Sequence, residues 1–302
     1  MRPMVTSGCK GPHRPDRARR RPTSMGLAVP SRPMSASDLP DLRRAREGAT
    51  LLLTLDRPDA RNAYSEAMVD SLVRALEAAE RDDDVRCVII TGAGAAFSAG
   101  GDLKRMAQHE GMFAGGPAEL RRRYIDGIQQ IPRRFALTEK PVIAAINGPA
   151  IGAGLDLACM CDLRIAARGA QLGSTFVKVG LVPGDGGAYL LSRTVGFSRA
   201  LELMLTGRLV DTDEAQRIGL VHRVVEPAEL LPAARALAEQ LAALPPLALR
   251  LTKRAAYRSF ETDLEQALEL AATYQGVVQN TADHHEAVQA MLERRAPKFT
   301  GA

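Results

Sequence analysis

The sequence predicts an α/β fold with a parallel β-sheet, followed by a region made only of helices. Two segments, 85–92 and 141–148, are continuous apolar runs of strand length, with helical patterns between and after them. Continuous apolar strands that alternate with helices are typical of parallel sheets covered on both faces. From about residue 227 onward strand patterns end and only helical periodicities follow.

The core begins with a strand that starts at Ala49 and ends at Pro58, because proline cannot donate to a sheet. Ser65 then caps an amphipathic helix that runs to about Arg81. The elements expected after it are, in chain order, a strand at 85–92, a helix with a basic face at 117–137, a strand at 141–148, a short helix at 153–160, strand segments at 162–167 and 170–173, and helices near 186–195, 198–205 and 212–218.

Four helices are expected in the C-terminal region, at 228–243, 246–258, 262–279 and 282–295. The last two are long and amphipathic, and their apolar stripes exceed what the flank of a sheet needs. The sequence therefore predicts a helical cap or an oligomer contact in this region.

Residues 1–45 are predicted to be a disordered extension rich in Arg, Pro and Ser. Residues 1–40 hold eight Lys and Arg but two Asp, so the net charge of +5 belongs to this extension and the rest of the chain carries about −1. An Arg-rich leader resembles a mitochondrial transit peptide, but repeated prolines interrupt the helix that such a leader needs. A later translation start at Met25 or Met34 is the alternative.

The composition also excludes several classes of protein. A near-neutral body offers no surface that would hold a nucleic acid, and no apolar run reaches the roughly 18 residues of a membrane span. No second Cys or His pair at zinc-binding spacing accompanies the cysteines. We therefore expect a soluble cytoplasmic protein with reduced thiols and no metal. The cysteines are Cys9, Cys87, Cys159 and Cys161.

Two glycine-rich turns carry the functional signal. The GAG sequences at 92–94 and 152–154 both lack the third glycine of a dinucleotide-binding fingerprint. Each turn follows a buried strand and leads into a helix start, so the backbone N–H groups of Gly101 and Ala153 are expected to point into one cleft. Two such donors form an oxyanion hole, which polarises a thioester carbonyl and stabilises an enolate.

Segments along most of the chain resemble the crotonase superfamily, the enoyl-CoA hydratases and isomerases. They are LDRPDARNA (55–63), AFSAGGDLK (96–104), KPVIAAINGPAIGAGLDLACMCDLRIAA (140–167), VGLVPGDGGAYLLSRTVG (179–196), LTGRLVDTDEAQRIGLVHRVV (205–225) and ERRAPKFTG (293–301). The resemblance implies a crotonase-like spiral of ββα units over 46–226. It also implies C-terminal helices over 227–302 that build a homotrimer or hexamer, and no cofactor beyond the coenzyme A of the substrate.

The resemblance also assigns residues to the site. Gly101 and Ala153 match the family's two oxyanion N–H donors, and the hydratase glutamates are replaced by Asp156 and Phe176. Lys298 and Phe299 match residues that reach coenzyme A from the same or a neighbouring subunit, although a solvated lysine is the alternative for Lys298. Further acyl-CoA contacts are expected at Ala99, Gly101, Asp102, Leu103 and Lys104.

The carboxylates decide which reaction is expected. Syn hydration needs two carboxylates that flank one water molecule, and Phe176 can do no acid or base work. Asp156 is therefore the first candidate, although a carboxylate at a helix start also binds free N–H groups. Asp185 is the second candidate, although related isomerases and dehalogenases place their aspartate one residue earlier, and Asx turn geometry is the alternative.

Isomerisation is the reaction that this pattern favours. Phe176 makes the pocket drier, and desolvation raises the pKa of a carboxyl toward the range that suits proton transfer. The pattern is most similar to acyl-CoA isomerases of the phenylacetate pathway, and hydration of an enoyl-CoA stays open. The alternatives are an acyl-CoA hydrolase or dehalogenase that uses an aspartate nucleophile, and a catalytically weak acyl-CoA-binding subunit.

Overall fold

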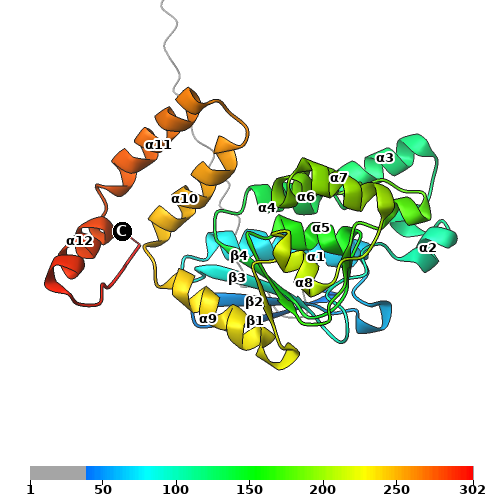
Figure 1. Cartoon of the computed structure of the whole chain (residues 1–302), viewed down its shortest axis with the longest axis horizontal. Helices are drawn as coiled ribbons and strands as arrows, with labels where there is room; N and C mark the ends of the chain where they lie inside the picture. The colour runs from blue at the N-terminus through cyan, green and yellow to red at the C-terminus, as the bar shows by residue number, and fades with distance from the viewer. Residues whose placement is uncertain (1–38, 302) are drawn as a thin grey trace, which may run out of the picture. The chain divides into compact units, whose positions relative to one another are not determined.

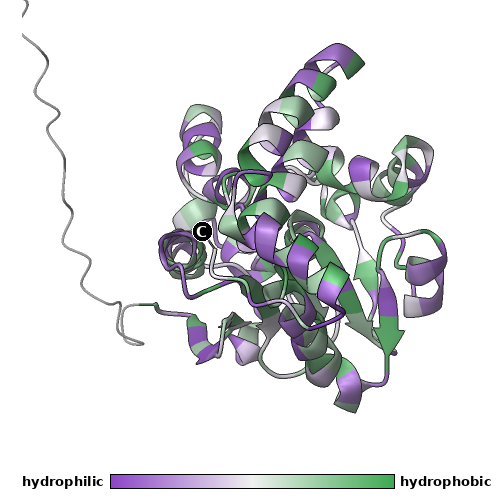
Figure 2. Cartoon of the chain, turned by 90° about the vertical axis from the view of Figure 1, so that its left-hand side faces the viewer, coloured by the Kyte–Doolittle hydropathy of each residue, from purple (hydrophilic) through white to green (hydrophobic). Residues whose placement is uncertain are grey.

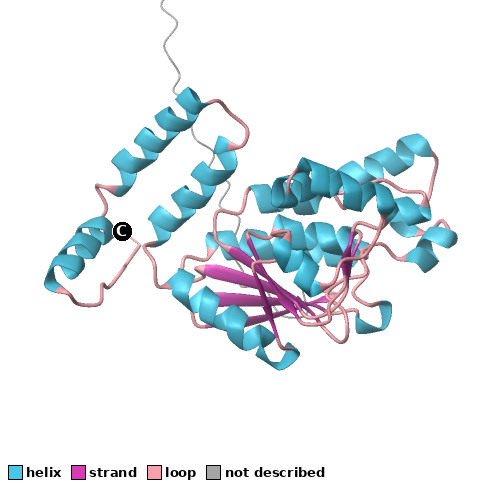
Figure 3. Cartoon of the chain, in the orientation of Figure 1, coloured by secondary structure: helices cyan, strands magenta, loops and turns pink. Residues whose placement is uncertain are grey.

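The computed structural model describes residues 39–301 of the chain. Its centre is a six-stranded sheet in the order β1-β2-β3-β4-β6-β8, which lies among the helices in Figures 1 and 3. β1 runs antiparallel to β2, and every other neighbouring pair is parallel. The strands are β1 (Leu42–Glu47), β2 (Thr50–Leu55), β3 (Cys87–Gly92), β4 (Val142–Ile146), β6 (Leu163–Ala167) and β8 (Arg223–Val225).

A second, smaller sheet pairs β5 (Ala150–Ile151) with β7 (Leu172–Gly173), and Ser98 forms a parallel bridge to Ala150. Each of β3, β4 and β6 is therefore followed by a short extended segment that belongs to this second layer. Helices then complete the repeating units of the spiral. They are α2 (Leu103–Ala107), α5 (Ala153–Met160) and α6 (Gly187–Val195).

Helices cover the sheet on both faces. α9 (Leu230–Ala242) packs on one face, and α1 (Glu66–Arg81) and α5 lie on the other in Figure 1. Figure 2 shows the central strands as largely hydrophobic ribbons. Because side chains alternate along a strand, every second residue of the strands meets α9. This core consists of Cys87, Ile89, Ile143, Ala145, Ile165 and Ala167 on the strands and Leu230, Ala234 and Ala238 on α9.

Three further helices, α10 (Pro246–Ser259), α11 (Leu264–Val278) and α12 (Ala282–Glu293), form the C-terminal region. A polar cluster fastens α10 to the core. Lys253 Nζ lies 2.7 Å from Asp162 Oδ2, and the hydroxyl of Tyr257 donates to Asp162 Oδ1 at 2.9 Å. The ion pair is well covered, since its side chains are 14% and 15% exposed.

The predicted α/β fold with C-terminal helices is confirmed, with corrections in two places. The expected helix 117–137 is wrong as one element: Gly127 ends α3 (Pro117–Asp126), and α4 (Gln130–Ala136) follows it. The ordered core also begins before residue 46, because β1 pairs with β2. β1 reads LRRARE and has no apolar pattern, so the sequence did not indicate it. The rest of the expected extension, residues 1–38, lies outside the described residues.

The other elements lie close to their expected positions. Ser65 caps α1 as predicted, since its hydroxyl accepts the N–H of Met68 at 3.0 Å. Helices α7 (Phe197–Thr206) and α8 (Thr212–Arg217) follow α6 as expected.

Candidate active site

A buried asparagine, Asn62, fixes the backbone of the first glycine-rich turn through hydrogen bonds. Asn62 donates through Nδ2 to the carbonyls of Ala93 and Ala96, at 2.9 and 2.8 Å, and accepts the N–H of Arg57 at 2.9 Å. A Cβ at Gly92 would overlap the carbonyl of Ala96. The loop after β3 is therefore folded tightly onto the segment before α1, and glycine is required where the two approach.

The first predicted donor, the N–H of Gly101, has a fixed direction. The carbonyl of Gly100 accepts the N–H of Tyr64 at 2.7 Å. Since a trans peptide unit places C=O and N–H on opposite sides, the N–H of Gly101 points away from Tyr64. It has no acceptor among residues 39–301, so it is free to bind an oxyanion.

The second predicted donor, the N–H of Ala153, stands at the start of α5. Gly152 precedes it with φ 54° and ψ −121°, a conformation that suits only glycine. The carbonyl of Gly152 accepts the N–H of Asp156 at 3.1 Å, so the N–H of Ala153 points out of the N-terminal end of the helix. It too lacks an acceptor within the described part of the chain.

The two turns are in direct contact. A Cβ at Gly100, where φ is +78°, would lie 2.8 Å from the nitrogen of Ala153 and 2.5 Å from the carbonyl oxygen of Ile151. A Cβ at Gly154 would overlap the carbonyl of Ser98. The two predicted donors are therefore neighbours in space, although they are 52 residues apart in the sequence. An oxyanion hole requires two N–H donors that are close together in this way.

Asp156 and Asp185 form a buried pair beside these turns. Asp156 is on the first turn of α5 and is 0% exposed, and Asp185 precedes α6 and is 2% exposed. The negative charge of Asp185 raises the pKa of Asp156, so the two carboxyl groups are close neighbours. Neither oxygen of Asp156 has a hydrogen-bond partner among residues 39–301, and neither does Oδ2 of Asp185. Two neighbouring buried carboxyl groups without donors favour a state in which one of them keeps a proton.

The surroundings explain why a proton is retained. Burial raises the pKa of Asp156 well above its ordinary value, and the negative charge of Asp185 raises it further. Burial also raises the pKa of Asp185. The pKa of Asp156 is raised further, so Asp156 is the member of the pair that keeps its proton to higher pH. A carboxyl that is protonated near neutral pH can act as an acid.

Several groups that the sequence analysis missed surround the pair. A Cβ at Gly187 would overlap the carboxyl of Asp156, so glycine makes room for the acid at the start of α6. The ring of Tyr124 covers Gly184, and Gln129 Nε2 donates to the carbonyl of Gly184 at 2.8 Å. Burial and the charge of Asp185 raise the pKa of Tyr124. Segment 124–129 therefore covers the turn that holds Asp185.

Phe176 lies beside the oxyanion turn. Its ring is 3.7 Å from the position of a Cβ at Gly152. It starts a short 3-10 helix, Phe176–Val179. This places an apolar ring beside the residue that precedes Ala153, and the expected drying of the pocket by Phe176 stays a prediction.

The predicted acyl-CoA contacts fall into two groups. Gly101, Asp102, Leu103 and Lys104 form the entry to α2, and the side chains of Leu103 and Lys104 are exposed beside the first turn. The half-buried Ala99 donates its N–H to the carbonyl of Arg61 at 2.9 Å. The carboxylate of Asp102 is committed to the fold, because it caps α2 and lies 3.6 Å from Arg57.

Lys298 and Phe299 do not join this site within one chain. The carbonyl of Phe299 is 3.5 Å from Arg86, which precedes β3, whereas the oxyanion turn follows the other end of that strand. Lys298 is exposed, and its N–H donates to Glu286 at 2.8 Å.

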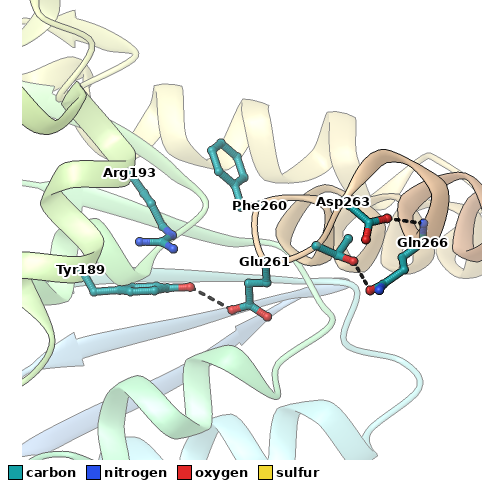
Figure 4. Close-up of a pocket in the computed structure, with 7 residues that line it drawn as sticks. Tyr189, Arg193, Phe260, Glu261, Asp263 and Gln266 are labelled. Atoms are coloured by element: carbon teal, nitrogen blue, oxygen red, sulfur yellow. Dashed lines mark hydrogen bonds between the residues drawn. The ribbon is translucent and has the colours of Figure 1, made fainter.

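A surface cavity of about 600 Å³ is lined by Tyr189 and Arg193 of α6 and by residues of the segment 260–266 (Figure 4). There the hydroxyl of Tyr189 donates to Glu261 at 2.8 Å, and the guanidinium of Arg193 is 3.4 Å from the centre of the Tyr189 ring. Within the described part of the chain, no three His, Cys, Asp or Glu side chains gather where a metal ion could be held. Among residues 39–301, every helix is too short or too polar to span a bilayer.

The comparisons with known proteins identify the family. The sequence profile described as "Enoyl-CoA hydratase/isomerase" matches residues 45–302, so the chain belongs to this family, the crotonase superfamily, and is an enzyme of it. The chain is 38% identical to the Short-chain-enoyl-CoA hydratase of Clostridium acetobutylicum, over 83% of this chain and 94% of that protein. It is also 38% identical to the 1,2-epoxyphenylacetyl-CoA isomerase of Escherichia coli, over 84% of this chain and 96% of that protein.

A solved structure agrees with this assignment. The crystal structure of an enoyl-CoA hydratase from Bacillus anthracis superposes with a TM-score of 0.81 at 34% identity, and the match covers 87% of this chain and 100% of that one. The predicted family and its spiral fold are confirmed. A hydratase and an isomerase are equally similar to the chain, so overall identity does not separate the two reactions. The arrangement of the carboxyl groups has to do so.

Proposed function

We propose that the protein is an acyl-CoA isomerase that moves the double bond of an enoyl-CoA by proton transfer. The observation that carries the proposal is the buried pair of carboxyl groups, Asp156 and Asp185, which lies beside two free N–H donors and in which the pKa of Asp156 is raised well above its ordinary value. A group that holds a proton near neutral pH and a second group that can accept one are the requirements for moving a proton along a carbon chain.

The reaction has two balanced steps. The carboxylate of the pair removes a proton from Cα of a 3-enoyl-CoA, and the electrons of that C–H bond move into the thioester, whose oxygen becomes an enolate. The N–H groups of Gly101 and Ala153 donate to this oxygen, and such donors act on the charge that develops in the transition state. A proton from the pair then adds to Cγ, the carbonyl re-forms, and the double bond lies between Cα and Cβ.

Hydration is disfavoured by the retained proton of Asp156 and by Phe176. Hydration uses two carboxylates that flank one water molecule. Burial and the charge of Asp185 raise the pKa of Asp156, and the ring of Phe176 covers the neighbouring part of the turn at Gly152. The arrangement therefore supports proton transfer without a bound nucleophilic water.

A cavity with one apolar wall supports the use of acyl groups longer than four carbons. The cavity has a volume of about 400 Å³; Cys159, Met160, Leu190 and Phe135 belong to its apolar wall, and charged residues such as Lys253 and Glu261 line the rest. Cys159 and Met160 are three and four residues beyond Asp156 on α5, so they lie on the same face one turn further along the helix. We propose that the far end of the acyl group extends from the carboxyl pair into this cavity.

The assembly and the binding of coenzyme A are part of the same proposal. Phe197 and Leu205 on α7 are 70% and 67% exposed, and Phe260, Leu264 and Met291 are exposed in the C-terminal region. A large exposed apolar surface favours association, which supports a homotrimer or hexamer. Lys298 and Phe299 would then contact coenzyme A from a neighbouring chain. We propose no cofactor beyond the substrate's own coenzyme A, and a cytoplasmic location.

The test uses the purified protein and 3-hexenoyl-CoA in deuterium oxide. Mass spectrometry should find 2-hexenoyl-CoA with deuterium in the acyl chain, and little 3-hydroxyhexanoyl-CoA. Accumulation of the hydroxy product would instead make the protein a hydratase. No turnover with straight-chain and aryl-substituted substrates, together with retained acyl-CoA binding, would make it a binding subunit.

A second experiment addresses an aspartate nucleophile. In single-turnover reactions in water labelled with heavy oxygen, attack by Asp156 or Asp185 on the substrate would leave the label in that carboxyl group after hydrolysis. We expect no label in either peptide.

A further inference from the structure

Tyr64 touches both turns of the oxyanion hole. It is 0% exposed. Its backbone N–H donates to the carbonyl of Gly100 at 2.7 Å, and its hydroxyl donates to the carbonyl of Ala153 at 3.3 Å. The first bond orients the peptide unit that carries the N–H of Gly101. The second reaches the residue that supplies the other N–H, across 89 positions of sequence.

The backbone of Tyr64 is fixed on both sides. Asn62, two residues earlier, is fully buried and donates to the carbonyls of Ala93 and Ala96. Ser65, the next residue, caps α1 and holds the N–H of Met68 at 3.0 Å. Because the backbone of Tyr64 is fixed, the hydrogen bond of its hydroxyl restrains the position of Ala153.

We propose that Tyr64 is a positioning residue that fixes the separation of the Gly101 and Ala153 N–H groups, through its hydrogen bonds to Gly100 and Ala153. This inference rests on the proposed function, since the oxyanion hole matters only if the substrate is an acyl-CoA thioester. The donors must lie within about 2.7 to 3.1 Å of the developing oxyanion, and small errors of position reduce the rate strongly.

The alternative is that the hydroxyl of Tyr64 only satisfies a buried carbonyl. Two observations favour positioning. The turns also approach so closely that a Cβ at Gly100 would be 2.8 Å from the Ala153 nitrogen, so a shift of α5 along its axis changes the donor separation directly. Burial raises the pKa of Tyr64 well above its ordinary value, and the negative charge of Asp185 raises it further, so the hydroxyl remains a donor.

The test compares Tyr64→Phe with the full-length wild type. Phenylalanine keeps the ring and the backbone bond to Gly100 and removes only the hydroxyl. We expect kcat for an enoyl-CoA to fall by about 5- to 50-fold, less than the 10²- to 10³-fold loss when a whole donor is removed. KM should change by less than about twofold, because uniform binding of coenzyme A is untouched.

A spectroscopic readout separates positioning from a purely structural role. The absorption of a conjugated thioester such as cinnamoyl-CoA moves to longer wavelength when its carbonyl is polarised. Wild type should produce this shift on binding, and Tyr64→Phe should produce a smaller one at saturation. Ser71→Ala is the matched control. Ser71, on α1, is also fully buried, and its hydroxyl donates to the backbone carbonyl of Pro40 at 2.8 Å. It should change stability but neither kcat nor the shift.

The outcomes distinguish this inference from the proposed function. An unchanged kcat and an unchanged spectral shift in Tyr64→Phe, with an active wild type, would overturn the role of Tyr64 alone. A wild type that neither shifts the spectrum nor turns over any acyl-CoA would remove the proposed function itself. If Tyr64→Phe loses folding, the midpoint of thermal unfolding reports it, and the spectral shift of the fraction that remains folded still decides the question.

Discussion

The backbone half and the carboxyl half of the site are built in opposite ways. Around Gly101 and Ala153 nearly every polar group that faces the protein has a partner, through Asn62, Tyr64 and the start of α5. Around Asp156 and Asp185, three carboxyl oxygens have no hydrogen-bond partner within the described part of the chain. The backbone half therefore stabilises the folded state, whereas the carboxyl half destabilises it.

The difference indicates where function and stability conflict. Satisfied backbone donors point in fixed directions at no cost to folding, whereas buried carboxyl groups without donors oppose folding unless they keep a proton. Substitutions in the carboxyl half should therefore reduce activity and increase stability, and substitutions in the backbone half should reduce both.

The largest effect is expected for Asp156→Asn. The amide cannot exchange a proton but can donate to Asp185, so kcat should fall by about 10³-fold or more. The free energy of unfolding at pH 7 should rise by about 1 kcal/mol, because a buried carboxyl is replaced by a neutral donor. Steady-state kinetics and urea unfolding measure the two quantities.

Asp162→Asn is the control for that experiment. Asp162 is half-buried, and it is paired with Lys253 at 2.7 Å and accepts the hydroxyl of Tyr257. Removal of its charge leaves Lys253 without its counterion and should cost about 3 kcal/mol of stability. Should both substitutions destabilise the protein equally, the contrast between the two halves of the site would be wrong.

Gly100→Ala should damage the backbone half. Alanine at φ +78° is strained, and its Cβ would lie 2.5 Å from the carbonyl oxygen of Ile151, so the turns must move apart. We expect kcat to fall by about 10²-fold and stability to fall by about 2 kcal/mol. Gly116→Ala is the control, since a Cβ there meets no atom within 4 Å and its φ of −80° suits alanine. Comparable losses in both variants would show that the close approach is not the cause.

The acyl cavity gives a smaller, substrate-dependent effect. Leu190→Trp should fill part of the space beyond the carboxyl pair, so kcat/KM for a ten-carbon substrate should fall about 10-fold relative to a four-carbon one. Leu244→Trp makes the same change in the loop between α9 and α10, outside this cavity, and should leave the ratio unchanged. Equal losses for both chain lengths would place the acyl group elsewhere.

The pH dependence of stability gives a further comparison. The pKa of Asp156 is raised in the folded protein, so the folded state binds more protons than the unfolded state once the pH passes the ordinary range of an aspartate. The contribution of this group to stability is therefore largest at low pH and is lost as pH rises toward the raised pKa, by at most about 1.4 kcal/mol per pH unit. The stability difference between Asp156→Asn and wild type should grow with pH in urea unfolding. A constant difference would mean that the proton is not retained.

The sequence predicted the strands, helix starts and turns more completely than the contacts between distant segments. Continuous apolar runs gave β3 and β4, Ser65 gave the start of α1, and the glycines around 100 and 152 gave both turns, because each of these signals is local. The bond from Tyr64 to Ala153 and the ring of Tyr124 on Gly184 join distant segments without leaving a pattern.

Asp185 and β1 are instructive exceptions. The sequence indicated the turn that holds Asp185. Because the aspartates of related enzymes lie one residue earlier, the direction of the Asp185 side chain stayed open. The packing of α6 on α5 brings this side chain beside Asp156. The sequence of β1, LRRARE, has no apolar face, so only its pairing with β2 shows that it is a strand.

The smallest effect is expected at Lys298, where the single chain and the proposed assembly differ. Within one chain Phe299, the neighbour of Lys298, lies near Arg86, which precedes β3, whereas the oxyanion turn follows the opposite end of that strand. If a neighbouring chain brings it to coenzyme A, Lys298→Ala should raise KM for an enoyl-CoA about threefold, as expected for an exposed charge pair of up to about 1 kcal/mol. The same variant should not change KM for an enoyl-pantetheine, which lacks the nucleotide phosphates. Because kcat depends on the carboxyl pair and the backbone donors, it should remain unchanged with both substrates, and an equal rise in both KM values would assign Lys298 to the fold of α12 instead.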